Sequence, residues 1–145
     1  MLSPTVDYAL RVVKLLAVER PASFTAEQIA AQTEIPFDTT TALIQQMVAA
    51  DLIHAGQAGA AFSLIAKPER LSMLDVVQAV EPIQRIRFCP LGNKSHGARL
   101  CAMHRRLDDA LAKVEAAFAE TSIASVLPDP DSGELPCELG ARSTP

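Results

Sequence analysis

The amino-acid sequence predicts a mainly α-helical fold, and three observations support this. Apolar residues make up 49% of the 145 residues, which is enough to build a buried core. Aromatic residues make up only 4% and tryptophan is absent, so the core must be built from Ala, Leu, Val and Ile. That composition favours helices over a sandwich or a barrel. Several segments also repeat apolar residues at the spacing of a helix face.

The first helix is expected over residues 4–17, where a proline suits the first turn and apolar residues recur at helical spacing. A short second helix over residues 25–31 begins with a capping-box pattern. Ile35-Pro36 interrupts it, and a third helix is expected over residues 38–50. Two short helices joined by a tight turn, after a longer helix, are typical of a helix-turn-helix.

Two strand-like runs follow within residues 52–65, on either side of a turn that contains Gly56 and Gly59. This pattern predicts a β-hairpin, which after a helix-turn-helix would be a two-stranded wing. A further helix is expected over residues 71–80, with Ser72 as its N-cap.

A long apolar stripe occupies the last third of the chain. Six members recur at spacings of three and four, and Ile123 extends the stripe five residues further on: Leu100, Met103, Leu107, Leu111, Val114, Phe118 and Ile123. Such a stripe predicts a long helix that packs on a second copy of the chain, the alternative being a helix folded back on its own domain. The expected organisation is a winged helix-turn-helix domain over 1–81, a cysteine-bearing sensor loop over 82–99, a dimerisation helix over 100–127 and a flexible tail over 128–145.

Charge is distributed unevenly around a net value of −4. Residues 21–66 contain no Lys or Arg but include four acids, whereas residues 82–107 contain no acid but include six Lys or Arg. No apolar run approaches the length of a membrane span, and the N-terminus lacks a signal-peptide pattern, so we expect a cytoplasmic protein without a membrane partner. The sequence also lacks a phosphate-binding loop and a nucleophile elbow, which argues against an enzyme.

The basic segment holds two of the three cysteines, Cys89 and Cys101, and two of the three histidines, His96 and His104. The third cysteine is Cys137. Soft ligand atoms gathered on a loop and the first turn of a helix indicate a metal or redox site.

Several motifs together resemble the winged-helix regulators of the IscR/NsrR type over residues 3–127. They are Thr5-Val-Asp7-Tyr8-Ala-Leu-Arg11, Ile29-Ala30, Ile35-Pro36, the glycine hairpin, and Leu74-Asp75-Val-Val-Gln-Ala-Val80-Glu81. The resemblance implies a transcriptional regulator that binds double-stranded DNA as a homodimer. It also implies that cysteines in the loop after the wing domain hold an iron–sulfur cluster, and that the long helix makes the dimer.

The cluster-binding pattern of that family falls here on Cys89, Ser95, Cys101 and His104, so serine replaces the middle cysteine. Cluster iron prefers thiolate and accepts imidazole, whereas a serine hydroxyl resists deprotonation. The resemblance implies that a carboxylate from the partner subunit, here that of Asp7, can be a further ligand. The expected cofactor is a 2Fe-2S cluster on Cys89, Cys101 and His104, with Asp7, Ser95 or His96 completing the set.

The expected DNA contacts are neutral side chains of the third helix and the wing: Thr39, Thr40, Thr41, Gln45 and Gln57. Duplex affinity comes largely from Lys and Arg on phosphates, and both are missing from 21–66. Two hypotheses therefore remain. The first is a dimeric regulator whose DNA binding responds to a cluster or to the redox or metal state of Cys89, Cys101 and His104. The second is a relative that has lost DNA binding and serves as a redox, metal or protein-partner sensor.

Overall fold

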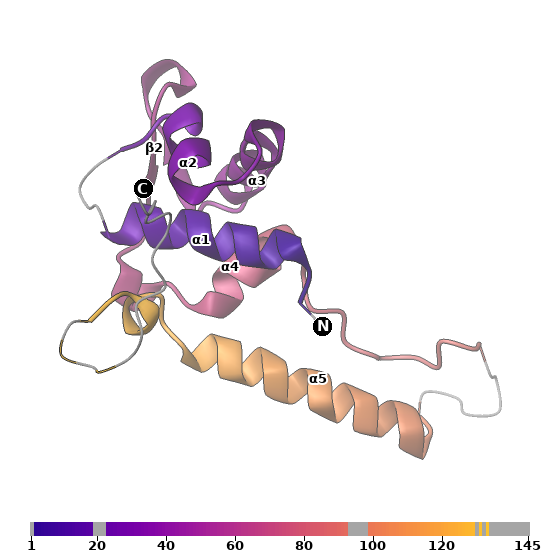
Figure 1. The fold of residues 1–145 in the computed structure, drawn as a ribbon. Helices are drawn as coiled ribbons and strands as arrows, with labels where there is room; N and C mark the ends of the chain where they lie inside the picture. The colour runs from indigo at the N-terminus through magenta and orange to yellow at the C-terminus, as the bar shows by residue number, and fades with distance from the viewer. Residues whose placement is uncertain (1, 19–22, 93–98, 130, 132, 134–145) are drawn as a thin grey trace, which may run out of the picture.

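A computed structural model describes residues 2–18, 23–92, 99–129, 131 and 133. Its main elements are α1 (Pro4–Val18), α2 (Ala26–Thr33), α3 (Phe37–Ala49), β1 (Ile53–Ala55), β2 (Phe62–Leu64), α4 (Met73–Val80) and α5 (Ala102–Glu120). Figure 1 shows α2, α3 and the hairpin on one side of α1, with α4 and α5 on the other. The predicted mainly helical fold, a winged helix-turn-helix with a two-stranded wing and a long C-terminal helix, is confirmed.

Local sequence explains how the helix-turn-helix begins and turns. The Thr25 hydroxyl accepts a hydrogen bond from the Gln28 backbone N–H at 3.2 Å, and the Gln28 side chain accepts one from the Thr25 N–H at 2.9 Å. This reciprocal capping box fixes the start of α2. The helix ends at Thr33, and its C-cap Glu34 adopts a left-handed conformation with φ of 57°. Pro36 is the N-cap of α3. Proline suits this position because backbone N–H groups at the start of a helix have no partner within the helix, and proline has no N–H.

The wing is short and tightly closed. β1 and β2 pair antiparallel, with Ile53 opposite Leu64 and Ala55 opposite Phe62. A 3₁₀ turn (Gln57–Gly59) joins them, and Gly59 takes a φ of 65°, which favours glycine. Phe24 exchanges two backbone hydrogen bonds with Phe62, at 3.0 and 2.8 Å, and so attaches the segment before α2 to the wing.

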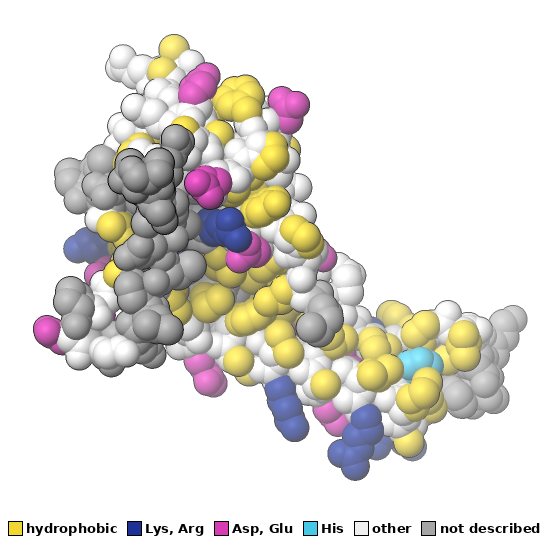
Figure 2. All heavy atoms as spheres, in the orientation of Figure 1, with side chains coloured by type: hydrophobic (Ala, Val, Ile, Leu, Met, Phe, Trp, Pro, Cys, Tyr) yellow, Lys and Arg dark blue, Asp and Glu magenta, His cyan; other side chains and the backbone are white. Residues whose placement is uncertain are grey.

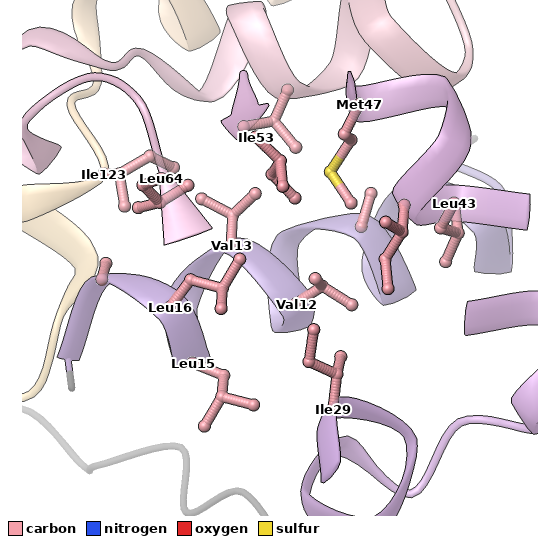
Figure 3. Packing of buried hydrophobic residues seen from close by; sticks show 14 of the residues in the cluster. Val12, Val13, Leu15, Leu16, Ile29, Leu43, Met47, Ile53, Leu64 and Ile123 are labelled. Atoms are coloured by element: carbon pink, nitrogen blue, oxygen red, sulfur yellow. The ribbon is translucent and has the colours of Figure 1, made fainter. Parts of the chain in front are cut away.

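The core forms around α1, whose Val12, Val13 and Leu16 are almost fully buried. Figure 3 shows the side chains that converge on this helix from α2, α3, the wing and the segment after α5: Ile29, Leu43, Met47, Ile53, Leu64 and Ile123. All of them are aliphatic or sulfur-containing, as the low aromatic content predicts. No described helix is long and apolar enough to cross a membrane.

The last helix differs from its prediction over 100–127. α5 ends at Glu120, because the chain then turns back and joins the core. The Met73 N–H donates to the Thr121 carbonyl at 2.8 Å, and the Ile123 N–H donates to the Leu71 carbonyl at 2.7 Å. Ile123 is 2% exposed. It belongs to the core, and its expected place in the helical stripe was wrong.

Much of the stripe on α5 is open to solvent in the single chain. Met103, Leu107 and Val114 are 60%, 50% and 42% exposed, whereas Leu111 and Phe118 are half-buried and His104 is the one buried residue of this helix. Figure 2 shows hydrophobic side chains gathered on the arm that α5 forms with residues 82–92. The helix therefore gains little of its stability from burial in its own chain.

Replacing Ile123 by alanine tests the attachment of the α5 end to the core. Ile123→Ala removes a side chain that is 2% exposed, so we expect a loss of about 2–4 kcal/mol in the free energy of unfolding. Val126→Ala is the matched control, because Val126 is 43% exposed and should cost below about 0.5 kcal/mol. Urea denaturation of both variants measures the difference, and equal stabilities would contradict this packing.

Candidate functional site

Two of the predicted ligands meet at the start of α5. Cys101 is the N-cap residue of this helix, and its Sγ lies 3.3 Å from Nδ1 of His104, one turn further on. Cys101 is half-buried and His104 is 8% exposed. A sulfur and an imidazole nitrogen at this spacing are soft donors that can bind one metal ion together.

Cys89 lies in the extended segment between α4 and α5. It is half-buried, and its carbonyl accepts a hydrogen bond from the Gly92 N–H at 3.0 Å, which closes a turn at Gly92 with φ of 64°. The segment borders a hollow of about 660 Å³, whose other walls include Gln78 of α4 and Glu115 of α5. Cys89 therefore faces a space that the two helices and the loop share.

The single chain does not bring all the predicted ligands together. Within the described parts of the chain, no three His, Cys, Asp or Glu side chains gather closely enough to hold a metal ion. Asp7 is exposed on α1, where its carboxylate contacts the Arg11 guanidinium at 2.7 Å. Ser95 and His96 lie outside the described residues. The donor types suit a cluster, and the structure assembles two of them, Cys101 and His104.

An ion pair ties the Cys89 segment to α5. Asp108 accepts hydrogen bonds from Arg85 Nε at 2.7 Å, from its Nη2 at 2.8 Å, and from the Ile86 backbone N–H at 2.9 Å. A Glu115 oxygen lies 3.7 Å from Arg85 Nη1. We call these contacts of Arg85, Ile86 and Asp108 the loop clamp. Its bidentate geometry is the stronger form of ion pair.

The loop clamp changes the acidity of both partners. Hydrogen bonds from Arg85 above all, and also from the Ile86 N–H, lower the pKa of Asp108 to about 2, while burial opposes this shift. The same hydrogen bond raises the pKa of Arg85 above its ordinary value. Both groups are charged at neutral pH, so the clamp is formed there.

Sequence reasoning did not find the loop clamp. Asp108 is 23 residues from Arg85, and no local motif links them. One signal was present, since Asp108 is the first acid after the basic run 82–107. Glu81 adjoins the other end of the run, so this signal alone does not single out Asp108.

The predicted DNA contacts divide into exposed and buried groups. Gln45 and Gln57 are exposed, while Thr39 and Thr41 are half-buried. Thr40 was expected to contact DNA, but it is 0% exposed, and its hydroxyl donates to the Pro36 carbonyl at 3.1 Å. Thr40 packs in the core, where it holds the start of α3 in place, so it is not available to DNA.

Comparison with known proteins identifies the family of the chain and relates its fold to solved structures. Residues 2–129 match the model of the family described as "Rrf2: Iron-dependent Transcriptional regulator". No curated protein sequence matches the chain.

Solved structures share the fold at low sequence identity. CymR, the global cysteine regulator of B. subtilis, is 15% identical with a TM-score of 0.69, over 89% of this chain and 98% of that one. The oxidized form of Staphylococcus aureus CymR is 20% identical with a TM-score of 0.65, over 91% and 99% of the two chains. T. potens IscR is 14% identical with a TM-score of 0.69, over 86% and 84%.

Replacing Asp108 by asparagine tests the loop clamp through its pH dependence. Because the pKa of Asp108 is lowered, its stabilising effect is present above the unfolded pKa of about 4 and is lost as the pH falls towards 2. We expect Asp108→Asn to lower stability at pH 7, and the difference from the parent protein to disappear near pH 2. Denaturant titrations between these pH values measure it.

Asp109→Asn is the control, since Asp109 is the exposed neighbour on the same helix and lies outside the clamp. Hydrogen exchange at the Ile86 amide should be faster in Asp108→Asn and unchanged in the control. A constant stability difference at every pH would contradict the clamp.

Proposed function

The chain belongs to the Rrf2 family of transcriptional regulators, and we propose from this premise that its DNA binding responds to an iron–sulfur cluster. The family is one of DNA-binding, non-enzymatic regulators. The observation that carries the proposal is the pairing of Cys101 Sγ with His104 Nδ1 at 3.3 Å. The cytoplasm, which keeps thiols reduced, is where such a site would operate.

Three residues of one chain would hold the cluster: Cys89, Cys101 and His104. Cys101 and His104 are already in contact, and the loop clamp holds the Cys89 segment against the same helix. Ile86 is three residues before Cys89, a reach of at most about 10 Å, and Asp108 is about 6 Å along α5 from His104. A 2Fe-2S cluster, when bound, would supply one-electron redox chemistry there.

The fourth ligand distinguishes a site within one chain from a site shared by two. Asp7 lies on α1, is exposed, and is not gathered with Cys101 and His104 in the single chain. We propose that the Asp7 carboxylate comes from the other subunit, with Ser95 or His96 as the alternatives within the chain. The Arg11 contact would then keep the Asp7 carboxylate oriented when the cluster is absent.

The exposed stripe on α5 supports a homodimer. Leu107 and Val114 lie on this helix with half or nearly half of their surface open, and Phe88 and Leu91 of the neighbouring segment are 75% and 83% exposed. Exposed apolar side chains gathered in this way favour association, and a second copy of the chain presents the same ones. We propose that two α5 helices pack together along it.

A signal at the cluster can reach the DNA-binding elements through α4 and α1. The segment after α5 is bonded to the start of α4, and α4 packs on α1 and α3. A change in how residues 82–92 meet α5 would shift α5 relative to the wing domain. In a dimer, that shift changes the spacing of the two α3 helices.

A second candidate function rests on one observation. Residues 23–66, which include α2, α3 and the wing, contain no Lys or Arg. A relative that has lost DNA binding and acts as a redox, metal or protein-partner sensor would show this feature. DNA selection, described below, separates the two.

Cluster binding is tested by spectroscopy of protein prepared without oxygen. We expect visible charge-transfer absorption with about two irons per chain, lost in Cys101→Ala and weakened in Asp7→Asn. Cys137→Ser is the matched control, because Cys137 is a cysteine outside the proposed ligand set. Ser95→Cys should slow loss of the cluster in air, because it restores a thiolate. Colourless, iron-free parent protein from an iron-replete preparation would disprove the cluster.

Dimer formation is tested by sedimentation. Leu107→Asp places a charge in the exposed stripe, and we expect it to reduce the mass from two chains to one. Arg106→Asp is the control, since Arg106 is an exposed residue next to the stripe and should leave the mass at two chains. A parent protein that sediments as one chain at micromolar concentration would contradict the dimer.

A further inference from the structure

The outward face of α3 carries small side chains and two amides and has no basic residue. Ala42, Gln45, Gln46 and Ala49 are exposed, while Leu43 and Met47 fill the opposite, buried side of the helix. Residues three apart on a helix are neighbours on one face, so Ala42 and Gln45 lie side by side. As the second helix of a helix-turn-helix, α3 is the element that enters the major groove.

The charged groups around this face do not suit guanine or phosphate. Asp38, at the start of α3, is exposed and is an acceptor only. Guanine presents two acceptors, N7 and O6, in the major groove, and the usual partner is a bidentate Arg or Lys. Neither residue type occurs among residues 23–66.

The space beside Gln45 is apolar. A hollow of about 330 Å³ lies between α3 and the wing, bordered by Ile44 and Val48 of α3 and by Ala55 and Phe62 of the wing. Its polar lining comes from Thr41 and Gln45, and no charged residue lines it. Apolar atoms of a ligand would be accepted here more readily than a phosphate.

We propose that this face reads A·T base pairs, with Gln45 and Ala42 as the residues that determine specificity. The Gln45 amide can donate to adenine N7 and accept from adenine N6–H, while the Ala42 methyl can contact the 5-methyl group of thymine. The rise between the two residues along α3 is about 4.5 Å and one base-pair step is about 3.4 Å, so their side chains are spaced to reach the same or neighbouring pairs. The inference rests on the proposed function as a DNA-binding regulator and adds the sequence class that it binds.

The balance between neutral base contacts and phosphate contacts also predicts how DNA binding depends on salt concentration. Sequence discrimination would come from neutral contacts, which release no counterions. The phosphate contribution would come from the few cations outside residues 23–66, such as Arg70 and Lys67 just after the wing. The slope of log K against log salt should therefore correspond to few phosphate contacts per subunit.

Full-length protein is prepared both with and without oxygen. Each preparation is then used to select the duplexes that it binds from a random pool at low salt. We expect enriched half-sites in which two adjacent positions are A·T. Replacing thymine by uracil at these positions removes only the methyl group, and we expect one such change to weaken binding about two- to tenfold. Gln45→Ala should lose about tenfold in affinity and relax the adenine preference at one position.

Val126→Ala is the control, a neutral residue after α5 that is 43% exposed and should leave both affinity and preference unchanged. Enriched sites that hold G·C at the position altered by Gln45→Ala, or indifference to uracil throughout, would overturn the A·T inference while DNA binding stands. The absence of any enriched duplex in either preparation would overturn both the inference and the DNA-binding function, in favour of a protein partner for this face.

Discussion

Besides its packing on α4, α5 is held in place by two attachments, one towards each end of the helix. At its C-terminal end, Ile123 enters the core and bonds to the Leu71 carbonyl. Towards its N-terminal end, Asp108 binds Arg85 and the Ile86 N–H. Everything proposed for the site follows from this arrangement, since Cys101 and His104 are carried on the helix and Cys89 on the segment that the clamp holds. An apolar anchor and an ionic clamp also respond to different conditions, so one end can loosen while the other stays fixed.

Much of the fold was predictable because its signals are local. The capping boxes at Thr25 and Ser72 involve residues three apart, and the glycine turn of the wing lies between its two strands. The course of the chain after Glu120 was not predictable in the same way. Ile123 follows Phe118 by five residues, which breaks the three-and-four spacing, and its hydrogen bond to Leu71 shows that it lies beyond the helix. Thr40 failed as a DNA contact for a related reason, since polarity in the sequence does not reveal a buried hydroxyl that bonds to the preceding turn.

The candidate site was predictable in its chemistry but only partly in its geometry. The spacing of Cys101 and His104 places them one helical turn apart, and the structure brings them into contact. The place of Cys89 depends on a contact between residues 85 and 108, which no periodicity encodes. In our proposal, the Asp7 ligand comes from a second chain. The structure of a single chain therefore does not give the distance between Asp7 and the other ligands.

The charge distribution differs between the proposed cluster site and the face of α3. A cluster with thiolate ligands is anionic, and the basic run 82–107 surrounds the residues proposed to hold it. The face of α3 lacks such charge, so discrimination there must rest on shape and neutral hydrogen bonds. Weak phosphate binding lowers affinity for every duplex equally, whereas a Gln–adenine contact changes the affinity of particular sites. In a dimer with few phosphate contacts, occupancy of a target depends strongly on both α3 helices matching their half-sites at once. A small change in α5 at the cluster, which alters the spacing of the two α3 helices, would then be enough to release the DNA.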